Sequence, residues 1–375
     1  MKKFLEDKKT PLFALVIIIF VWRICLFFVE TLASFLLTER EKFMGPISLA
    51  NFDGIHYLLI AERGYGLHQE AFFPLFPFLI SLLAHVLGEN YLIASILVVY
   101  LSLTISLFLF WRLVSVDFQK KISRWSIAFL LLFPTAFFLG SIYTESFFLL
   151  LVFGSFYAAR RGNWWLAGLL GGLASATRMV GIFLLPALLL EFYLQRYQGK
   201  KLEVRWIDIK KVAGVFLVPT GLASFIVYLQ NTVGDPLAFV HAQTAFGANR
   251  SGNEIILLPQ VIYSYIKILI TVPLTNYHYW IALLEIMSFL AAFFILILNI
   301  QRIRLSYFVF SILSILTPTF TGTLSSMPRY ILAAFPIFMV LSLIRSNRTK
   351  ILLLGISSIF LILFTLLFAK GYFVA

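Results

Sequence analysis

The sequence has little charge, a single cysteine and no long polar stretch, and each shortage narrows what the protein can be. Only 13% of its 375 residues are charged, whereas 61% are hydrophobic and the mean hydropathy is +0.94. A soluble core needs far less apolar sequence, so we expect an all-α polytopic membrane protein. The one cysteine, Cys25, lies in the first apolar run and can form no intramolecular disulfide. Because no polar stretch is long enough to fold separately, residues 1–375 should form a single integral domain.

Motifs of several other enzyme and transport classes are also missing. The sequence contains no glycine-rich phosphate loop, no Walker pattern, no Gly-x-Ser-x-Gly and no Cys-x-x-Cys. These absences remove P-loop nucleotide sites, serine-hydrolase elbows and dithiol redox sites. Inverted repeats, which are typical of many transporters, are absent as well. Four histidines stand alone, without metal-ligand spacing to a carboxylate or cysteine: His68, His85, His241 and His278.

Long apolar runs fill the chain from residue 11 onward. The first, residues 11–37, follows four lysines and has no Ala-x-Ala cleavage site, so it predicts an uncleaved first helix. Further apolar runs lie near residues 72–88, 91–113, 125–140, 143–160, 164–194, 212–230, 261–275, 279–300, 305–322, 329–344 and 351–372. Because several are shorter than the roughly 20 residues of a perpendicular span, we expect about 9–12 membrane segments.

Basic residues gather in a few loops, which the positive-inside rule places on the cytoplasmic side. They are Lys120, Lys121 and Arg124; Arg160 and Arg161; Arg196, Lys200, Lys201, Arg205, Lys210 and Lys211; Arg302 and Arg304; and Arg345, Arg348 and Lys350. This orientation, together with anionic lipid, accounts for much of the net charge of +13, so no nucleic acid partner is needed. With the amino terminus also inside, the external segments are 38–71, 141–145, 177–181, 231–260 and 325–330.

Residues 72–88 conflict with this topology. A crossing there and another at 91–113 would place the basic residues 120–124 outside. Either 72–88 is re-entrant or the charge rule fails at this point. Pro74 and Pro77 favour an irregular segment, which membranes tolerate only where protein or water covers the backbone.

The first external loop, 38–71, carries an ionisable cluster at the membrane surface that packing does not explain. Its residues 47–63 predict a short amphipathic surface helix, on which Asp53 and His56 share a face and Glu62 lies opposite. Asp53 fits two roles equally well, a helix N-cap and a general base. For His56, a hydrogen-bonded interfacial role ranks above a role as ligand or base.

Several motifs resemble one family of membrane enzymes. The first is Asp53-Gly54-x-His56-Tyr57-Leu58-x-Ile60-Ala61-Glu62-x-Gly64-Tyr65, followed at matching spacing by Ala71-Phe72-Phe73-Pro74-x-Phe76-Pro77. The others are Pro134-Thr135-Ala136-Phe137-Phe138, Tyr143-Thr144-Glu145-Ser146, Ala176-Thr177-Arg178 with Gly181, Ile262-Tyr263-Ser264-Tyr265-Ile266 and Pro328-Arg329-Tyr330. With these motifs the chain closely resembles the PIG-V-like family, which includes the GPI mannosyltransferase that adds the second mannose. It departs from the family at Phe52, where a tryptophan usually precedes the aspartate.

The resemblance implies a GT-C-like helical bundle and an inverting glycosyltransferase that takes sugar from a polyprenyl-phosphate donor. Such a transfer needs a carboxylate to accept the proton of the attacking hydroxyl and cations to meet the departing phosphate. We therefore expect Asp53 as the general base, with Arg178 and Arg329 near the phosphate and Arg63 as an alternative. Each arginine is equally well explained as a headgroup anchor or a snorkelling side chain.

The other candidates have two interpretations each. Glu145 either pairs with Arg178 or accepts a hydrogen bond from a sugar hydroxyl, and the two weigh the same. Phe72 and Phe73 can line a polyprenyl groove, although ordinary aromatic residues at the membrane boundary explain them better. A Mg or Mn ion bridging Asp53 and a phosphate fits chemically, without a motif to support it.

Three functions follow from these patterns. The favoured one transfers mannose from polyprenyl-phosphate-mannose to a glycan or glycolipid acceptor on the external face. The alternatives are a transporter or flippase of a lipid-linked sugar and a noncatalytic scaffold of a glycosylation complex. We expect a prokaryotic plasma membrane, with the lumenal face of the ER as the alternative. The candidate catalytic residues are Asp53 and His56, and the candidate substrate-binding residues are Glu62, Arg63, Phe73, Pro74, Glu145, Arg178, Arg329 and Tyr330.

Overall fold

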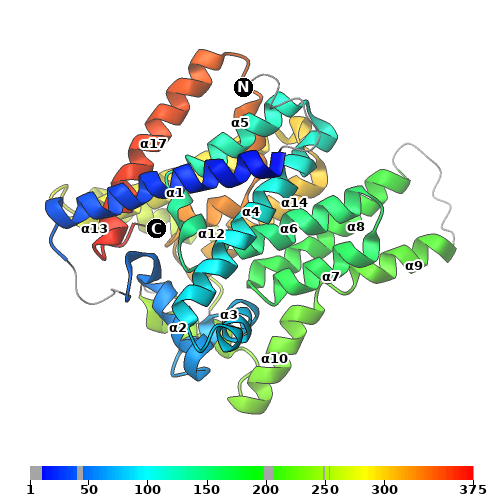
Figure 1. Ribbon diagram of the computed structural model, residues 1–375, viewed down its shortest axis with the longest axis horizontal. Coiled ribbons are helices and arrows are strands. Elements are labelled where there is room, and N and C mark those ends of the chain that lie inside the picture. Colours follow the sequence, from blue (N-terminus) through cyan, green and yellow to red (C-terminus); the bar gives the residue numbers. More distant parts are fainter. Residues whose placement is uncertain (1–10, 40–44, 198–205, 248–249, 253, 375) are drawn as a thin grey trace.

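The computed structural model describes residues 11–39, 45–197, 206–247, 250–252 and 254–374 (Figure 1). Within these ranges every regular element is a helix, which confirms the all-α prediction. The α-helices are α1 Pro11–Leu36, α2 Asp53–Arg63, α3 Leu75–Val86, α4 Tyr91–Asp117, α5 Lys120–Leu131, α6 Glu145–Arg160, α7 Trp164–Ser175, α8 Leu184–Arg196, α9 Trp206–Val215, α10 Thr220–Thr232, α11 Ala238–His241, α12 Leu258–Thr271, α13 Tyr277–Leu298, α14 Leu305–Leu316, α15 Met327–Tyr330, α16 Pro336–Ser342 and α17 Asn347–Ala369. The basic residues Lys200, Lys201 and Arg205 and the four lysines near the amino terminus lie outside the described residues.

Five of the described helical stretches are long and apolar enough to cross a membrane: α1, α4, Met179–Arg196, α13 and α17. The number is six if α9 and α10, which are bent by 45° relative to each other, count as one broken span. This is fewer than the 9–12 segments expected. Several predicted runs fold instead as apolar helices of 10–17 residues, among them α3, α7 and Leu305–Thr321.

Helix α3 bears on the conflict over residues 72–88. It has 12 residues and is therefore about 18 Å long, well short of a hydrocarbon core about 30 Å thick. The next helix after α1 that is long enough to cross is α4. Two crossings, by α1 and α4, leave the amino terminus and Lys120 on the same side of the membrane. The helix lengths and the positive-inside rule therefore agree on the side of the membrane on which Lys120 lies.

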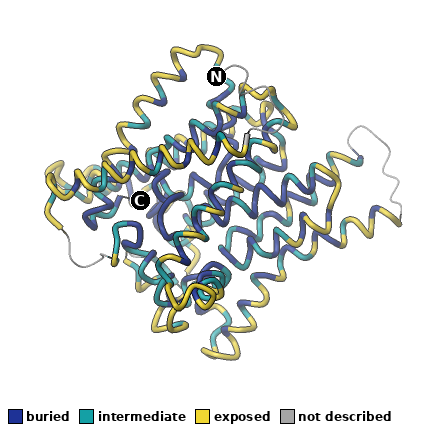
Figure 2. The backbone as a smooth tube through the Cα atoms, viewed as in Figure 1, coloured by how far each residue is buried: buried dark blue, intermediate teal, exposed yellow. Residues whose placement is uncertain are grey.

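The outer helices carry apolar side chains that face away from the protein. On α1, Phe28 is 66% exposed and Phe35 is 82% exposed, and on α17 Ile359 is 67% exposed. Figure 2 shows exposed residues along much of both helices, while buried residues concentrate in the interior of the bundle. A contiguous apolar exterior of this kind is what contact with lipid requires, because lipid tails replace the core that would otherwise cover it.

Glycines allow α7 to pack closely against α9 and α10, as the run of glycines near residue 170 predicts. A Cβ atom added at Gly168 would lie 1.8 Å from the carbonyl oxygen of Gly214, and one added at Gly221 would lie 1.9 Å from that of Gly172. No side chain fits in those spaces, so the helix backbones touch directly. The seam packs α7 against α9 and α10, and α7, α8 and α9 together form one arm of the bundle (Figure 1).

Two buried hydrophobic clusters meet around the centre of the protein. The larger joins α1–α8 to α16 and α17, and the second is built mainly from α12, α13, α14 and α15. Between them lies a large cavity, whose walls come from both clusters.

Candidate active site

The helix that carries Asp53 begins later than the sequence predicts. A short 3-10 helix at Ser48–Ala50 precedes α2, which starts at Asp53 rather than near residue 47. The chain turns between them at Phe52, whose φ of 54° is uncommon for a residue other than glycine. Phe52 occupies the N-cap position of α2, and no side chain caps the helix there. The N-cap interpretation of Asp53 is therefore wrong, and its carboxylate is available for other partners.

Asn51 fixes the backbone in front of Asp53. This residue is fully buried, and its side-chain amide donates to the carbonyl oxygen of Phe368 at 2.8 Å, near the end of α17. Its side-chain oxygen accepts from the backbone N–H of Gly45 at 2.9 Å. The hydroxyl of Tyr143 donates to the Asn51 carbonyl oxygen at 2.8 Å. Two distant segments and the nearby Gly45 thus hold the start of α2 in one position.

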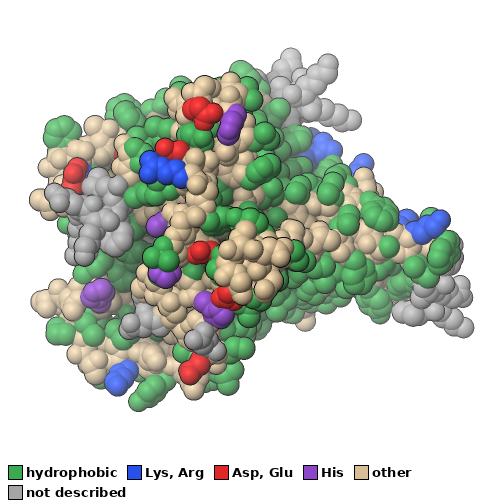
Figure 3. Space-filling model, turned by 90° about the horizontal axis from the view of Figure 1, so that it is seen from below, with side chains coloured by type: hydrophobic (Ala, Val, Ile, Leu, Met, Phe, Trp, Pro, Cys, Tyr) green, Lys and Arg blue, Asp and Glu red, His purple; other side chains and the backbone are tan. Residues whose placement is uncertain are grey.

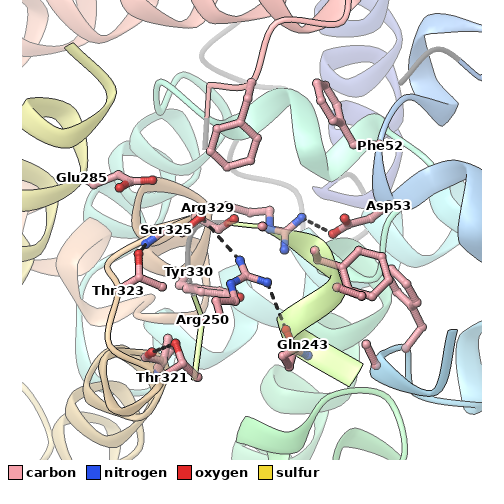
Figure 4. A pocket seen from close by; sticks show the side chains of 18 of the residues that line it. Phe52, Asp53, Gln243, Arg250, Glu285, Thr321, Thr323, Ser325, Arg329 and Tyr330 are labelled. Atoms are coloured by element: carbon pink, nitrogen blue, oxygen red, sulfur yellow. Dashed lines mark hydrogen bonds and ion pairs between the residues drawn. The ribbon is translucent and has the colours of Figure 1, made fainter. Parts of the chain in front are cut away.

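Four charged side chains from distant parts of the chain form one row of ion pairs. Nη1 of Arg329 donates to Oδ2 of Asp53 at 2.6 Å, and Nε of Arg329 lies 3.5 Å from Oε1 of Glu145. Nη1 of Arg178 donates to the same Glu145 oxygen at 2.6 Å. The side chains of Glu145 and Arg329 are 3% and 12% exposed, so the pairs are shielded from water. Figure 4 shows the contact between Arg329 and Asp53.

Arg250 adds a third guanidinium to the site. It donates to Oε1 of Gln243 at 3.0 Å and lies 3.5 Å from the hydroxyl of Ser325, and both partners are neutral (Figure 4). No carboxylate of the described residues forms an ion pair with it. Arg250 therefore brings positive charge that the protein does not neutralise by direct contact.

The three arginines surround Tyr330. The guanidinium carbons of Arg178 and Arg329 lie 5.4 Å and 5.6 Å from the centre of its ring. Burial acts to raise the pKa of Tyr330, but the charges of Arg250, Arg329 and Arg178 bring it below the ordinary value. The direction of this shift indicates an electropositive environment that suits an anionic ligand.

At neutral pH the carboxylate of Asp53 is ionised and the ring of His56 is neutral. Burial acts to raise the pKa of Asp53, but the charge and hydrogen bond of Arg329, with smaller effects of Arg250 and His56, bring it below the ordinary value. The carboxylate is therefore ionised. Burial lowers the pKa of His56 against the opposing charge of Asp53, so its ring is neutral at pH 7.

His56 contacts Gln69 and two phenylalanine rings, and among the described residues no hydrogen bond or ion pair joins it to Asp53. Its Nδ1 lies 3.3 Å from the amide nitrogen of Gln69, and its ring stacks on Phe72 with 4.9 Å between the centroids. The ring of Phe246 meets it edge-on at 5.3 Å. The hydrogen bond agrees with the interpretation that the sequence favours for His56, and its place at the membrane surface stays a prediction.

The charged groups open into a cavity of about 1620 Å³. Typical small-molecule pockets measure about 300–1,000 Å³, so this one has room for a larger ligand. One part of the wall is polar, and on the side of α12 and α13 an apolar part includes Ile268, Val272, Ile281 and Ala282 beside the polar Tyr265, His278 and Glu285. Figure 3 shows a face on which acidic and histidine side chains gather over the half that contains α2, while hydrophobic side chains cover the arm of α7–α9.

Residues 17–318 match the protein family described as Mannosyltransferase (PIG-V), which is most of the sequence. The chain belongs to the PIG-V mannosyltransferase family. The motif resemblance is thereby confirmed, and the described helices that are long and apolar enough to cross a membrane support a multi-pass membrane protein.

Two known proteins are similar to this PIG-V family member. GPI alpha-1,6-mannosyltransferase 2 of Cricetulus griseus is 30% identical over 145 residues, which are 36% of this chain and 29% of that protein. The match thus spans less than a third of the length of this relative. Among solved structures, that of ArnT from Cupriavidus metallidurans in the apo state aligns with a TM-score of 0.47 at 17% identity. The alignment covers 89% of this chain and 62% of that one.

Most of the site residues predicted for the PIG-V family member line the cavity, and three do not. Those that do are Asp53, His56, Phe73, Glu145, Arg178, Arg329 and Tyr330. Glu62 and Arg63 instead pair with each other at 3.3 Å on the protein surface, with side chains 43% and 71% exposed. Both follow Asp53 on α2 but point away from the cavity, as the helix period places Glu62. Pro74 precedes α3 and supports its start without lining the cavity.

Glu145 supports both interpretations that the sequence left open. Its Oε1 forms the predicted ion pair with Arg178. Its Oε2 is buried and has no hydrogen-bond partner among the described residues. A buried carboxylate oxygen without a donor is costly, so this atom is suited to accept a hydrogen bond from a ligand.

Sequence reasoning missed Arg250 and Glu285, although signals for both were present. Arg250 is the only lysine or arginine between Lys211 and Lys267, in a stretch predicted to be external. Glu285 is an acid inside a predicted membrane span, where ionisable residues usually mark function. Both line the cavity.

A divalent metal ion is a poor fit to the carboxylates of this site. Among the described residues no group of three or more His, Cys, Asp or Glu side chains could hold one. Asp53 and Glu145 are already engaged by guanidinium groups. Mg and Mn favour several oxygen ligands around one position, which these two ion-paired acids do not supply.

Proposed function

We propose that the protein transfers mannose from polyprenyl-phosphate-mannose to a hydroxyl group of a glycan or glycolipid. The observation that carries this proposal is the meeting of Asp53 with three guanidinium groups in one large, partly apolar cavity. A carboxylate suits a hydroxyl that must lose a proton, guanidinium groups suit a phosphate, and an apolar wall suits an isoprenoid chain. Membership of the PIG-V family supports the choice of mannose.

The proposed reaction is a single displacement. The acceptor oxygen attacks the anomeric carbon of mannose from the face opposite the phosphate, and its proton passes to the carboxylate of Asp53. The bond between the anomeric carbon and the phosphate oxygen breaks, and its electron pair leaves with the phosphate. The products are a mannoside of inverted configuration and polyprenyl phosphate. No general acid is required, because the leaving group is an anion that cations can stabilise.

Arg329 has two tasks in this proposal. In the absence of donor it pairs with Asp53, which keeps the carboxylate ionised but weakens it as a base. A donor phosphate that binds among Arg178, Arg250 and Arg329 competes for the same guanidinium. As Arg329 turns toward the phosphate, Asp53 loses part of its stabilisation and becomes a stronger base. Donor binding would thus prepare the base for the acceptor.

We propose that the active site faces the external side of a prokaryotic plasma membrane, with the lumenal side of the ER as the alternative. The positive-inside rule supports this, because the basic ends of α5 and α8 are separated from α2 by the length of the bundle. The proposed partners are the donor lipid, a glycan or glycolipid acceptor and the surrounding membrane lipids. We propose no metal cofactor, since the carboxylates of the site are paired with arginines.

The proposal is tested by mannose transfer from radiolabelled polyprenyl-phosphate-mannose, with octyl α-mannopyranoside as the acceptor. We compare the wild type with Asp53→Asn and with Glu89→Gln, an exposed acid outside the cavity. Asp53→Asn should lose at least about 100-fold in rate, the usual contribution of a general base, and Glu89→Gln should match the wild type. EDTA should leave the wild-type rate unchanged. Full activity in Asp53→Asn would contradict the assignment of the base, and no transfer by the wild type would contradict the proposed reaction.

A further inference from the structure

Glu285 differs from the other buried acids of the protein. The described carboxylates that are at most 4% exposed are Glu145, Glu191, Asp208 and Glu285. The first three have cationic partners within 3.1 Å, in the pairs Glu145–Arg178, Glu191–Arg304 and Asp208–Arg196. Glu285 has no ion pair with any described cation, although the charge of Arg250 acts on it. A buried carboxylate without a paired cation is costly inside a membrane helix, so its retention calls for a ligand.

The position of Glu285 on α13 points it into the cavity. Four residues of this helix line the wall, His278, Ile281, Ala282 and Glu285, and their spacing of three, one and three residues places them on one helix face. Glu285 lies eight residues, or about 12 Å, beyond the start of α13. Figure 4 shows it across the cavity from Asp53, with Tyr330 and Arg329 between them.

Two hydrogen-bond donors of the protein orient the Glu285 carboxylate but do not occupy all of its acceptor positions. The hydroxyl of Tyr265 donates to its Oε2 at 2.5 Å, and the backbone N–H of Ser326 also donates to it. The Tyr265 hydroxyl is itself fixed by Thr323 at 3.0 Å and by the backbone N–H of Leu324 at 2.9 Å. A carboxyl group has more acceptor positions than these two donors occupy, so acceptor positions remain for a ligand.

The charge of the cavity indicates which ligand groups can use those positions. Arg178, Arg250 and Arg329 make it electropositive, which disfavours a cationic ligand group near Glu285. Neutral hydroxyl groups can donate hydrogen bonds without that repulsion. Neighbouring hydroxyls on a hexose ring are a suitable pair of donors for one carboxylate.

We propose that Glu285 accepts hydrogen bonds from neighbouring hydroxyl groups of a hexose bound between Asp53 and α13, and thereby contributes to the selection of the sugar. This inference rests on the proposed function, because it assumes a glycosyl substrate in the cavity. The hexose is either the mannose of the donor or the terminal sugar of the acceptor. Both present the same hydroxyl chemistry, and binding measurements distinguish them.

The test compares ligands with and without sugar on purified protein in detergent micelles. Dissociation constants are measured for farnesyl phosphate, farnesyl-phosphate-mannose and octyl α-mannopyranoside with the wild type, Glu285→Gln and the control Glu89→Gln. Replacing the carboxylate by an amide of the same shape should weaken binding of one mannosyl ligand about tenfold, since hydrogen bonds to charged groups are the strong ones. Farnesyl phosphate has no sugar, so its dissociation constant should not change in any variant.

Each outcome of the binding measurements either supports the inference or overturns it. Weaker binding of farnesyl-phosphate-mannose alone assigns Glu285 to the donor sugar, and weaker binding of octyl mannoside assigns it to the acceptor sugar. Wild-type binding of both mannosyl ligands by Glu285→Gln overturns the inference. So does an equal loss for farnesyl phosphate, because Glu285 would then only maintain the shape of the cavity. The transfer assay with the wild type tests the proposed function separately, since these binding constants do not depend on turnover.

Discussion

The ion pair between Arg329 and Asp53 predicts how mannose transfer depends on pH. In the wild type the arginine holds the pKa of Asp53 below its ordinary value, so the base stays ionised and the rate should not fall between about pH 8 and pH 5. The substitution Arg329→Gln removes the charge, whereas Arg329→Lys keeps it. We expect the acidic limb of the pH–rate profile to move to higher pH in the first variant only.

The direction of the shift follows from the two opposing influences on Asp53. Burial raises the pKa of its carboxyl group, while the charge of Arg329, 2.6 Å away, lowers it. An opposite charge this close usually changes a carboxyl pKa by about 1–3 units, so its removal should move the acidic limb to higher pH by about that much. A protonated carboxyl group cannot accept the proton of the attacking hydroxyl, so at pH 5 the variant should lose a larger share of its own maximal rate than the wild type.

The assay is the initial rate of transfer from polyprenyl-phosphate-mannose between pH 4.5 and pH 8.5, with donor well below its KM, because that rate reports the pKa of the base in the donor-free protein, where Arg329 pairs with Asp53. Arg329→Gln should also be slower at its optimum, because the phosphate loses a cation, but the position of the limb does not depend on that loss. Arg348→Gln, at the exposed start of α17, is the charge-matched control and should keep the wild-type profile. A stably folded Arg329→Gln protein with the wild-type limb would refute the reasoning, as would an equal shift in Arg329→Lys.

Two further predictions concern the phosphate and the glycine seam. Arg250→Gln should raise the KM for the donor about tenfold or more, because a charged hydrogen bond to the phosphate is lost. It should displace the acidic limb of the pH–rate profile less than Arg329→Gln does. An unchanged donor KM would show that Arg250 does not bind the phosphate. Gly168→Ala should lower the free energy of unfolding by about 1–3 kcal/mol, because its Cβ would meet a backbone oxygen at 1.8 Å. Thermal unfolding in micelles measures this against Gly355→Ala, where nothing lies within 4 Å of the added atom, and equal stability of the two variants would contradict it.

The fold class could be predicted because hydropathy dominates long apolar runs. Helices α1, α4, α13 and α17 lie on predicted runs, since a lipid-exposed stretch of this length must satisfy its backbone within a helix. Shorter runs were harder to interpret. The run 125–140 breaks after Leu131 into turns and the 3-10 helix Ala136–Gly140, because Pro134 lacks a backbone donor and disfavours a continuous helix. Hydropathy alone does not register such a break, so the bounds of the shorter helices could not be predicted from it.

The site could be predicted only in part, because its ion pairs join residues that are far apart in the sequence, and the helix period relates only residues that are close in the sequence. The sequence placed Asp53, Arg178 and Arg329 on one side of the membrane, and the structure brings all three into one cavity. Which arginine would meet Asp53 could not be derived, since the partner lies 276 residues away. The helix period did exclude Glu62 from the face of Asp53, and that geometry is confirmed.

The separation of Asp53 and Arg329 also has a consequence for biosynthesis. At about 5–20 residues per second, a ribosome adds Arg329 roughly 14–55 s after Asp53, given the 276 residues between them. During that interval the first carboxylate of the site has no guanidinium partner from α15. A nascent chain that stops before α15 therefore keeps an acid without its counter-ion and a cavity without one wall. The site can therefore not reach its final form until synthesis has passed Arg329.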